Sequence, residues 1–397
     1  METSILNLSD LTSESPLSLI TEKLETRIDT RRLRAVCHNL RKSIREPPKT
    51  TIPDDLKIIP VPFGYFSAKI SHYTLVESTI YAIQPLEEIP NPLETAATWF
   101  VKVEEQEFGP VKLKHTLCEF QLQNISEELP MSLNLLDYRV KEIAKAYELK
   151  PVCRENQETA DHVGGNQMSF EPEKVIVSED FDVMVMHNKG MTLSVLRYGD
   201  KNWLNVQDSC VDRYIKFDDV VYYDQKFYAV NRNGHTLSFD CKTLAMSPVT
   251  FPKDNLGNGK TFLVKKSGEG LFLVVKWSYS LFIYSDYQFA NHHYFPARFS
   301  VYKLANFQWD ELHGYGDRVF FLGHGCSFSV MGNEFPGCEK NSVYFSEKIL
   351  SAAVADDAHL SPRPGIFRKD DLSVRPLSAL PGRAQLFWPP PAWVKPN

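Results

Sequence analysis

The chain divides into two stretches that differ in how apolar and polar residues alternate. Within residues 1–46, apolar residues recur every three or four positions, which is the spacing of one face of an α-helix. The first set is Leu17, Ile20 and Leu24, and the second set is Leu33, Val36, Cys37, Leu40 and Ile44. This pattern predicts a module of two or three short helices, each too short to be stable without a partner for its apolar face.

Local signals predict where these helices begin and end. Ser15 can cap a helix, and Pro16 is tolerated in a first helical turn. Asp29 is the expected cap of the next helix. Residues 46–48, Glu-Pro-Pro, should end that helix, because proline lacks an amide donor and restricts the residue before it. We therefore expect a helical module at residues 1–46 and a second domain at residues 47–397.

After residue 48 the pattern becomes that of short strands. Runs rich in Val, Ile, Tyr and Phe alternate with breaks at Gly, Asn, Asp and Pro, as in residues 99–103, 183–187 and 318–322. Asp224-Gln225 and Asn233-Gly234 mark tight turns between such runs, and Asn-Gly is a strong hairpin signal. A dozen or so short strands of this kind predict an all-β domain.

Two segments of this domain are weakly similar to each other. Residues 213–239 and residues 307–330 each contain an Asp, one further residue, a Val and two aromatic residues, followed by a turn and another strand. A degenerate repeat of this kind favours a β-propeller of about six to eight four-stranded blades. The alternative all-β architecture is a pair of β-sandwiches.

One segment interrupts the strand pattern. Residues 131–149 carry apolar residues at helical spacing, namely Leu133, Leu136, Val140, Ile143 and Tyr147. The spacing predicts a helical excursion between blades.

Composition and charge exclude several classes of protein. The 397 residues carry 44 Lys and Arg against 50 Asp and Glu, and a net charge of −6 disfavours nucleic acid as a partner. No apolar run approaches the ~18 residues of a membrane-spanning helix, so no membrane partner is expected. Seven dispersed cysteines without a CxxC pair are typical of reduced thiols, which favours the cytoplasm, the nucleus or both.

The sequence shows no complete catalytic motif, and we expect no catalytic, cofactor-binding or metal-binding residues. Residues 259–261, Gly-Lys-Thr, match the end of a phosphate-binding loop, but Asp254 stands where the first glycine of that motif belongs. His324 and Cys326 could meet on one face of a strand, yet no acid is evident to orient the histidine. The first segment is better explained as a plain loop and the second as a structural turn.

The helical module resembles an F-box, the motif that docks onto the Skp adaptor of Skp–cullin–F-box ubiquitin ligases. The resemblance lies in residues 15–44, SPLSLITEKLETRIDTRRLRAVCHNLRKSI, where Arg34, Val36, Cys37 and Arg41 match a common R-x-V-C-x-x-W-R pattern. Leu40 stands where the pattern has Trp. The resemblance implies adaptor-binding residues at Pro16, Leu17, Ile20, Leu24, Leu33, Val36 and Leu40.

The rest of the chain resembles plant F-box proteins of the Skp-interacting-partner type, whose C-terminal region is a degenerate β-propeller. The matching strings are WDELHGYGDRVFFLGHGCSFSV at 309–330, EFPGCEKNSVYFSE at 334–347 and LFWPPPAWV at 386–394. The resemblance implies a non-catalytic subunit without cofactors, which binds a Skp-type adaptor, and through it cullin, and presents an unknown target protein for ubiquitination. The alternative is a protein-binding propeller that works without a ligase because its F-box has decayed at Leu40.

Overall fold

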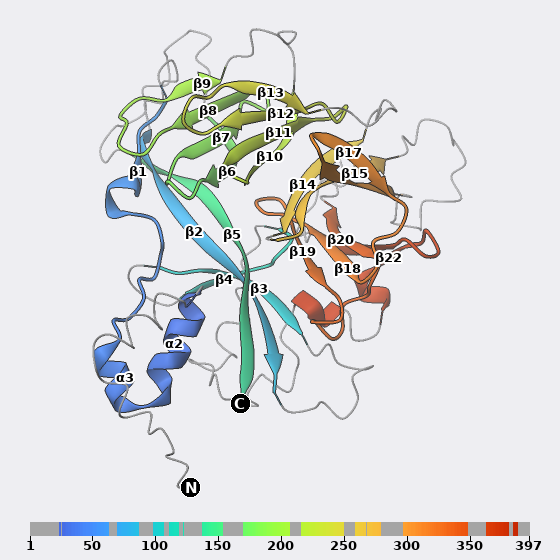
Figure 1. Cartoon of the computed structure of the whole chain (residues 1–397), viewed down its shortest axis with the longest axis horizontal. Coiled ribbons are helices and arrows are strands. Elements are labelled where there is room, and N and C mark those ends of the chain that lie inside the picture. Colours follow the sequence, from blue (N-terminus) through green and yellow to red (C-terminus); the bar gives the residue numbers. More distant parts are fainter. Residues whose placement is uncertain are drawn as a thin grey trace, which may run out of the picture.

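The computed structural model describes two helices followed by three β-sheets that are arranged around a centre (Figure 1). It describes residues 24, 26–62, 70–86, 98–106, 111–118, 122, 137–153, 170–206, 216–249, 259–266, 268–278, 297–347, 363–380 and 384–387. Most of the described residues after Pro48 are in strands, as the alternation pattern predicts.

The helical module contains α2 (Arg27–Val36) and α3 (His38–Ser43). Thr26 caps α2, because its hydroxyl accepts a hydrogen bond from the backbone amide of Asp29 at 3.2 Å. The prediction of Asp29 as the cap is therefore wrong by three positions: Asp29 lies in the first turn, and Thr26 donates to its carboxylate at 2.6 Å. Cys37, which is extended with φ −155°, separates the two helices, so the predicted single stripe lies on two helices.

Two long strands of the first sheet lie next to the helices and pair with each other. β2 (Ile70–Pro85) pairs antiparallel with β5 (Tyr138–Cys153), from Ile70 opposite Cys153 to Pro85 opposite Tyr138. The short helix η2 (Asp54–Leu56) precedes β2 in the chain, and the short strand β1 (Ile58–Ile59) pairs with it. On its other side β2 pairs with β3 (Trp99–Glu104), which in turn pairs with β4 (Lys112–Lys114).

The predicted helical excursion at residues 131–149 is wrong. Residues 138–149 belong to strand β5, while residues 131–136 lie outside the described residues. The helical spacing of the apolar residues does not produce a helix here, because β5 pairs with β2 along almost its whole length. Tertiary pairing of this extent outweighs local preference. Buried and exposed residues therefore do not alternate regularly along β5, since the two faces of the strand contact different neighbours at different points.

The strands after β5 in the first sheet and all strands of the second sheet form meanders in which chain neighbours are also sheet neighbours. The first sheet continues from β5 into β6 (Pro172–Val177), β7 (Val183–His187), β8 (Thr192–Leu196) and β9 (Leu204–Val206). The second sheet is β10 (Phe217–Tyr223), β11 (Lys226–Asn231), β12 (Thr236–Asp240) and β13 (Met246–Val249). Such repeated antiparallel meanders are the building unit of a propeller.

The third sheet joins two groups of strands. Its first group is β14 (Lys260–Lys266), β15 (Gly270–Ser278), β16 (Ala297–Ala305) and β17 (Gln308–Leu312). Its second group is β18 (Arg318–Leu322), β19 (Phe328–Met331), β20 (Ser342–Glu347), β21 (Arg363–Arg368) and β22 (Val374–Pro376). β14 and β19 connect the groups through a parallel pairing of Lys265 with Phe328.

Both predicted turn signals lie at turns. Asp224 and Gln225 have φ values of 48° and 58°, which is the left-handed pair that a tight two-residue hairpin requires between β10 and β11. Gly234, with φ 83°, lies in the connection between β11 and β12. The short-range signals in the sequence therefore located these hairpins correctly.

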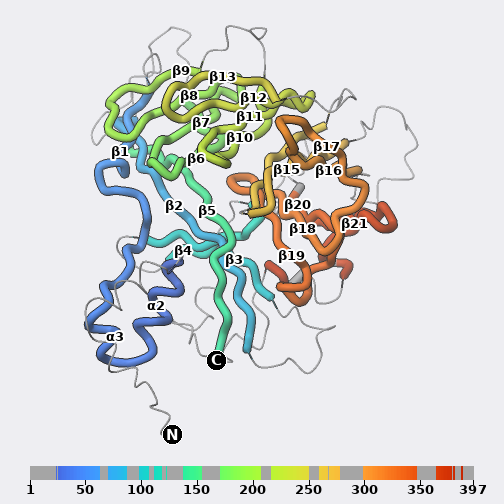
Figure 2. The backbone as a smooth tube through the Cα atoms, viewed as in Figure 1, coloured from blue at the N-terminus to red at the C-terminus, as the bar shows by residue number. Residues whose placement is uncertain are grey.

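An aromatic core joins the beginning of the β-domain to its end. Phe100 on β3 contacts Phe321 and Phe328, with ring centroids 4.9 and 6.1 Å apart. Phe387, in the short helix η6 (Ala384–Phe387), is fully buried in the same cluster, and η6 packs against β3. The colours of Figure 2 show the consequence, since the red C-terminal segment lies beside the β3 region.

Candidate functional site

The two helices of the module pack on each other around a small apolar centre. Leu40 and Ile44 are 1% and 5% exposed, and Leu33 and Cys37 pack against them. Val36, at the end of α2, is 57% exposed and points away from this centre. The structure thus separates two kinds of predicted residue: Leu33 and Leu40 face inward and Val36 faces outward. Leu24 is half-buried, and Pro16, Leu17 and Ile20 lie outside the described residues.

A buried arginine fixes this module to the β-domain. Arg27 is 8% exposed and donates to the hydroxyl of Thr79 on β2 at 2.7 Å. Its guanidinium lies 3.7 Å from Glu77, 3.9 Å from Glu142 and 4.0 Å from Glu105. These acids come from β2, from β5 and from the segment after β3, so one side chain ties α2 to three separate stretches of the sheet.

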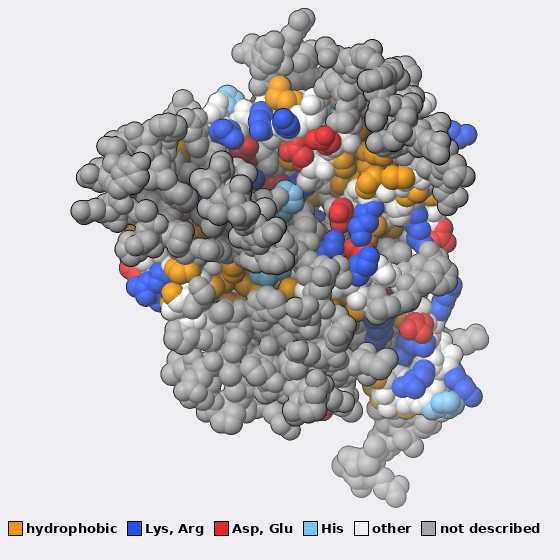
Figure 3. Space-filling model, turned by 180° about the vertical axis from the view of Figure 1, so that it is seen from behind, with side chains coloured by type: hydrophobic (Ala, Val, Ile, Leu, Met, Phe, Trp, Pro, Cys, Tyr) orange, Lys and Arg blue, Asp and Glu red, His pale blue; other side chains and the backbone are white. Residues whose placement is uncertain are grey.

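A second contact holds the other side of the same helix. Arg32 donates from Nη2 to the backbone carbonyl of Val140 on β5 at 2.8 Å. Together with Arg27, it restrains both the position and the rotation of α2 on the long β2–β5 pair. The basic residues that remain exposed, Arg41, Lys42 and Arg45, lie around α3, and Figure 3 shows blue side chains over this end of the molecule.

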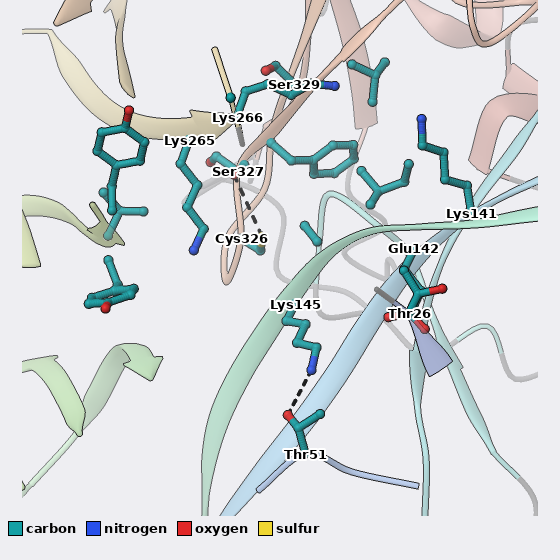
Figure 4. Close-up of a pocket in the computed structure, with 18 of the residues that line it drawn as sticks. Thr26, Thr51, Lys141, Glu142, Lys145, Lys265, Lys266, Cys326, Ser327 and Ser329 are labelled. Carbon is teal, nitrogen blue, oxygen red and sulfur yellow. Dashed lines mark hydrogen bonds between the residues drawn. The ribbon is translucent and has the colours of Figure 1, made fainter. Parts of the chain in front are cut away.

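A cavity of about 1860 Å³ lies between the sheets. Its lining comes from β5, β6, β10, β14 and β19, and it extends to Thr26, Asp29 and Arg32 in the helical module. Figure 4 shows its labelled residues, with Lys141 and Lys145 on β5 and Lys265 and Lys266 on β14. The cavity is thus shared between the body of the β-domain and the base of the module.

Five described lysines line this cavity, and most of them face a carboxylate. Lys141 lies 2.7 Å from Glu334, and Lys145 lies 3.5 Å from Glu77 and donates to Thr51 at 2.9 Å. Lys174 forms a buried ion pair with Asp219, whose other oxygen accepts from the amide of Leu263 at 2.7 Å. Lys266 lies 3.9 Å from Glu269.

The residues that resemble catalytic motifs have structural roles. In the Gly-Lys-Thr segment at 259–261, the amide of Thr261 donates to the carboxylate of Asp218 at 3.1 Å, and its hydroxyl donates to Asn231 O at 3.1 Å. A carboxylate therefore occupies the position where a phosphate would need free amides. His324 is exposed and donates its backbone amide to Leu117 O at 3.3 Å, while Cys326 lines the cavity.

The thiol of Cys326 is not activated as a nucleophile. Desolvation by burial raises the pKa of this thiol, which keeps it protonated at neutral pH. Among the described residues, no three or more His, Cys, Asp or Glu side chains converge as a metal site would require. Within the same residues, no helix is long and apolar enough to cross a membrane.

Sequence reasoning missed the lysine-lined cavity altogether. Its lysines come from β5, β6 and β14, which are far apart in the chain and meet only after the sheets have assembled. The adjacent pair Lys265-Lys266, at the end of a run of apolar residues, was the available signal, and it reads equally well as the solvated end of a strand.

Comparison with known proteins agrees with this architecture. The chain is 28% identical to the F-box protein SKIP23 of Arabidopsis thaliana over 95% of its length and 93% of that protein. It is 25% identical to the F-box protein At2g17036 of the same plant, over 95% and 92% of the two chains. These matches confirm the predicted resemblance to plant F-box proteins. Residues 73–374 match the KIB1-4 beta-propeller model, and the chain therefore belongs to the KIB1-4 β-propeller family.

Proposed function

We propose that this protein is the substrate-recognition subunit of a Skp–cullin–F-box type ubiquitin ligase. The helical module docks the Skp-type adaptor, and through it cullin, while the propeller, with six to eight blades as expected from the repeat length, holds the target protein. The observation that carries the proposal is the exposed Val36 on a small helical module that Arg27 fixes to the β-domain. Relatives that match nearly the whole chain are F-box proteins, which supports it.

The adaptor-binding residues divide into two groups in this proposal. Val36 makes direct contact, together with Leu24 and with Pro16, Leu17 and Ile20. Leu33 and Leu40 act from inside the module by holding α2 and α3 together. The substitution of Leu for Trp at position 40 is therefore accommodated within the module's own centre, where Leu40 is 1% exposed. This favours a working F-box over the alternative of a decayed one.

The mechanism is proximity, and the chain performs no covalent step. An adaptor bound to the module and a target bound to the propeller are held at a fixed separation, because Arg27 and Arg32 restrain α2 on the β2–β5 pair. A ubiquitin-charged enzyme carried by the adaptor complex then meets the target lysine at a raised effective concentration.

The test is co-purification of the full chain with a co-expressed Skp-type adaptor. Val36→Asp should reduce adaptor capture at least about tenfold, because an unpaired carboxylate at a desolvated contact costs more than about 1 kcal/mol. Val111→Asp is the matched control, since Val111 is 47% exposed on the β-domain. Equal capture by the two variants would contradict the assignment of Val36.

If the unsubstituted chain captures no adaptor although circular dichroism shows that it is folded, the result favours the ligase-independent function. The protein would then be a β-propeller that binds its partner without a ligase.

A further inference from the structure

Three cations around the end of α3 differ from the cations of α2 in having no carboxylate partner. Each of the four arginines of α2 lies within 4.0 Å of a carboxylate. Arg41, Lys42 and Arg45 are exposed, and in the described part of the chain no carboxylate lies within that distance of any of them. We call these three residues the basic cluster.

The basic cluster is held close to Val36, the exposed residue to which the proposed function assigns adaptor contact. Arg34, two residues before Val36, donates to the backbone carbonyl of Arg41 at 3.1 Å and also to that of Ile44. These bonds fix the end of α3 against the end of α2. Leu40 and Ile44 bury the other side of α3, so the cations face outward. A partner that covers Val36 therefore comes close to them.

The module and the rest of the chain carry opposite charges. Residues 26–50 contain eight Lys and Arg against two Asp and Glu, which is a charge of +6. The whole chain carries −6, so all other residues together carry −12. This polarity attracts an acidic partner to the module and repels it from the β-domain, which favours encounters in the productive orientation. Figure 3 shows blue side chains together at this end of the molecule.

The helix dipole explains only part of the basic cluster. Arg41 and Lys42 lie in the last turn of α3, where a positive charge stabilises the helix. Arg45 lies beyond Ile44, the C-cap residue, and is outside the turn on which the dipole acts. A structural role for the first two cations therefore leaves the third without an explanation.

The surroundings of the basic cluster favour a protein partner over a nucleic acid. Surfaces that bind single strands combine cations with aromatic side chains for base stacking, and residues 26–50 contain no Phe, Trp or Tyr. Three cations also neutralise few phosphates, while the charge of −12 on the rest of the chain repels a polyanion. Carboxylates on a folded protein, in contrast, need only a few charge-assisted contacts.

We propose that the basic cluster binds an acidic segment of the Skp-type adaptor, beside the apolar contact of Val36. This inference rests on the proposed function and adds an electrostatic component to adaptor docking. Because exposed ion pairs add little to affinity once they have formed, the main effect is on the rate of association.

The experiment measures the association rate of the full-length protein with an immobilised Skp-type adaptor by biolayer interferometry. Ionic strengths of about 0.1 M and about 1 M give screening lengths of about 10 Å and about 3 Å. We expect the rate to fall at least about tenfold between them. The triple variant Arg41→Gln, Lys42→Gln and Arg45→Gln should associate at least about tenfold more slowly than the unsubstituted chain at the lower ionic strength, and equally fast at the higher one.

A second triple variant controls for net charge. Lys201→Gln, Lys216→Gln and Lys242→Gln together remove the same charge from exposed positions on the β-domain. This variant should associate nearly as fast as the unsubstituted chain, because its changes lie away from the module. Equal slowing by the two triple variants would overturn the proposal, since net charge alone would then explain the effect.

A charge-preserving variant separates attraction from folding. Arg41→Lys combined with Arg45→Lys keeps both positive charges and should leave the association rate and its dependence on ionic strength unchanged. If this variant associates as slowly as the glutamine triple variant, the arginines act through the structure of the module, and the proposal is overturned.

Failure of this inference and failure of the proposed function give different results. Adaptor association at a rate that does not depend on ionic strength would overturn the role of the basic cluster and leave the ligase proposal standing. No association of the folded, unsubstituted chain would refute both. Binding of labelled poly(U) RNA or of phosphatidylserine vesicles that is lost in the glutamine triple variant, while its adaptor association rate is unchanged, would assign the cluster to another partner and overturn the inference.

Discussion

At the scale of single residues, burial controls the protonation of His115. His115 follows β4 in the chain and is 5% exposed, and its ring centroid lies 4.9 Å from that of Phe387. Nδ1 accepts a hydrogen bond from the amide of Leu117 at 3.2 Å, which requires this nitrogen to be unprotonated. Desolvation lowers the pKa of His115 to about 4, against 6.5 for the free side chain.

This shift predicts a loss of stability in acid. Between pH 6.5 and pH 4 the unfolded chain takes up a proton at His115 and the folded chain does not, so the free energy of unfolding falls as the pH falls. The contribution of one such histidine is about 3 kcal/mol over this range. Urea unfolding at several pH values should show a smaller loss for His115→Asn, which keeps an acceptor near Leu117. A loss as large as in the unsubstituted chain would contradict this explanation.

Single residues also show what the sequence could and could not predict. The apolar positions Leu33, Val36 and Leu40 of the module were predicted from their spacing, which is a local property, and Leu33 and Leu40 lie in its apolar centre. Which of them is exposed was not predictable, since the break at Cys37 rotates α3 relative to α2 and turns Leu40 inward. The distinction between the buried Leu40 and the exposed Val36 required the tertiary structure.

At the scale of elements, the docking of α2 on the β2–β5 pair depends on one cation among several acids. Arg27→Met should lower the free energy of unfolding by about 3–5 kcal/mol, because it removes the guanidinium shared by Glu77, Glu105 and Glu142 and leaves Glu142 without a counter-charge among the described residues. Arg31→Met, one turn further along, is the control: Arg31 is 33% exposed in its side chain, has one acid at 3.8 Å, and should cost less than about 1 kcal/mol. Denaturant titration of both variants tests this, and similar losses would contradict a special role for Arg27.

The elements themselves were predicted unevenly, for a physical reason. Strands such as Val183–His187 and Arg318–Leu322 were located to the residue, because short apolar runs between turn signals define them locally. Strand β5 was mistaken for a helix, because its sequence carries a helical period and its true partner, β2, begins 68 residues earlier, at Ile70 against Tyr138. Pairing between distant segments leaves little trace in either segment alone.

At the scale of the whole molecule, an aromatic core closes the β-domain. Phe387→Ala should lower the free energy of unfolding by about 3–5 kcal/mol, because a fully buried ring that contacts both the first and the last sheet leaves a cavity behind. Phe307→Ala is the matched control, since Phe307 is 55% exposed at a turn and should cost less than about 1 kcal/mol. Thermal unfolding followed by circular dichroism would compare them, and equal shifts would refute the closure argument.

The all-β character of the domain and its membership of a propeller family followed from the sequence, because both rest on repeated local patterns and on strings such as residues 309–330. The cavity did not, since Lys145, Lys174 and Lys265 lie on three strands that meet only once the sheets have assembled. The closed aromatic core and the cavity both depend on contacts between residues that are far apart in the chain.

The ion pair of Lys174 with Asp219 has a consequence for the receptor's own lifetime. A subunit held beside a ubiquitin-charged enzyme exposes its own amines to the same reaction as its target. Lys102, Lys114 and Lys174 are at most 8% exposed and are shielded from it, whereas Lys201, Lys216 and Lys242 lie open on the outer surface. If the protein works as proposed, self-modification will be confined to exposed lysines, and Lys174 inside the cavity will remain unmodified between targets.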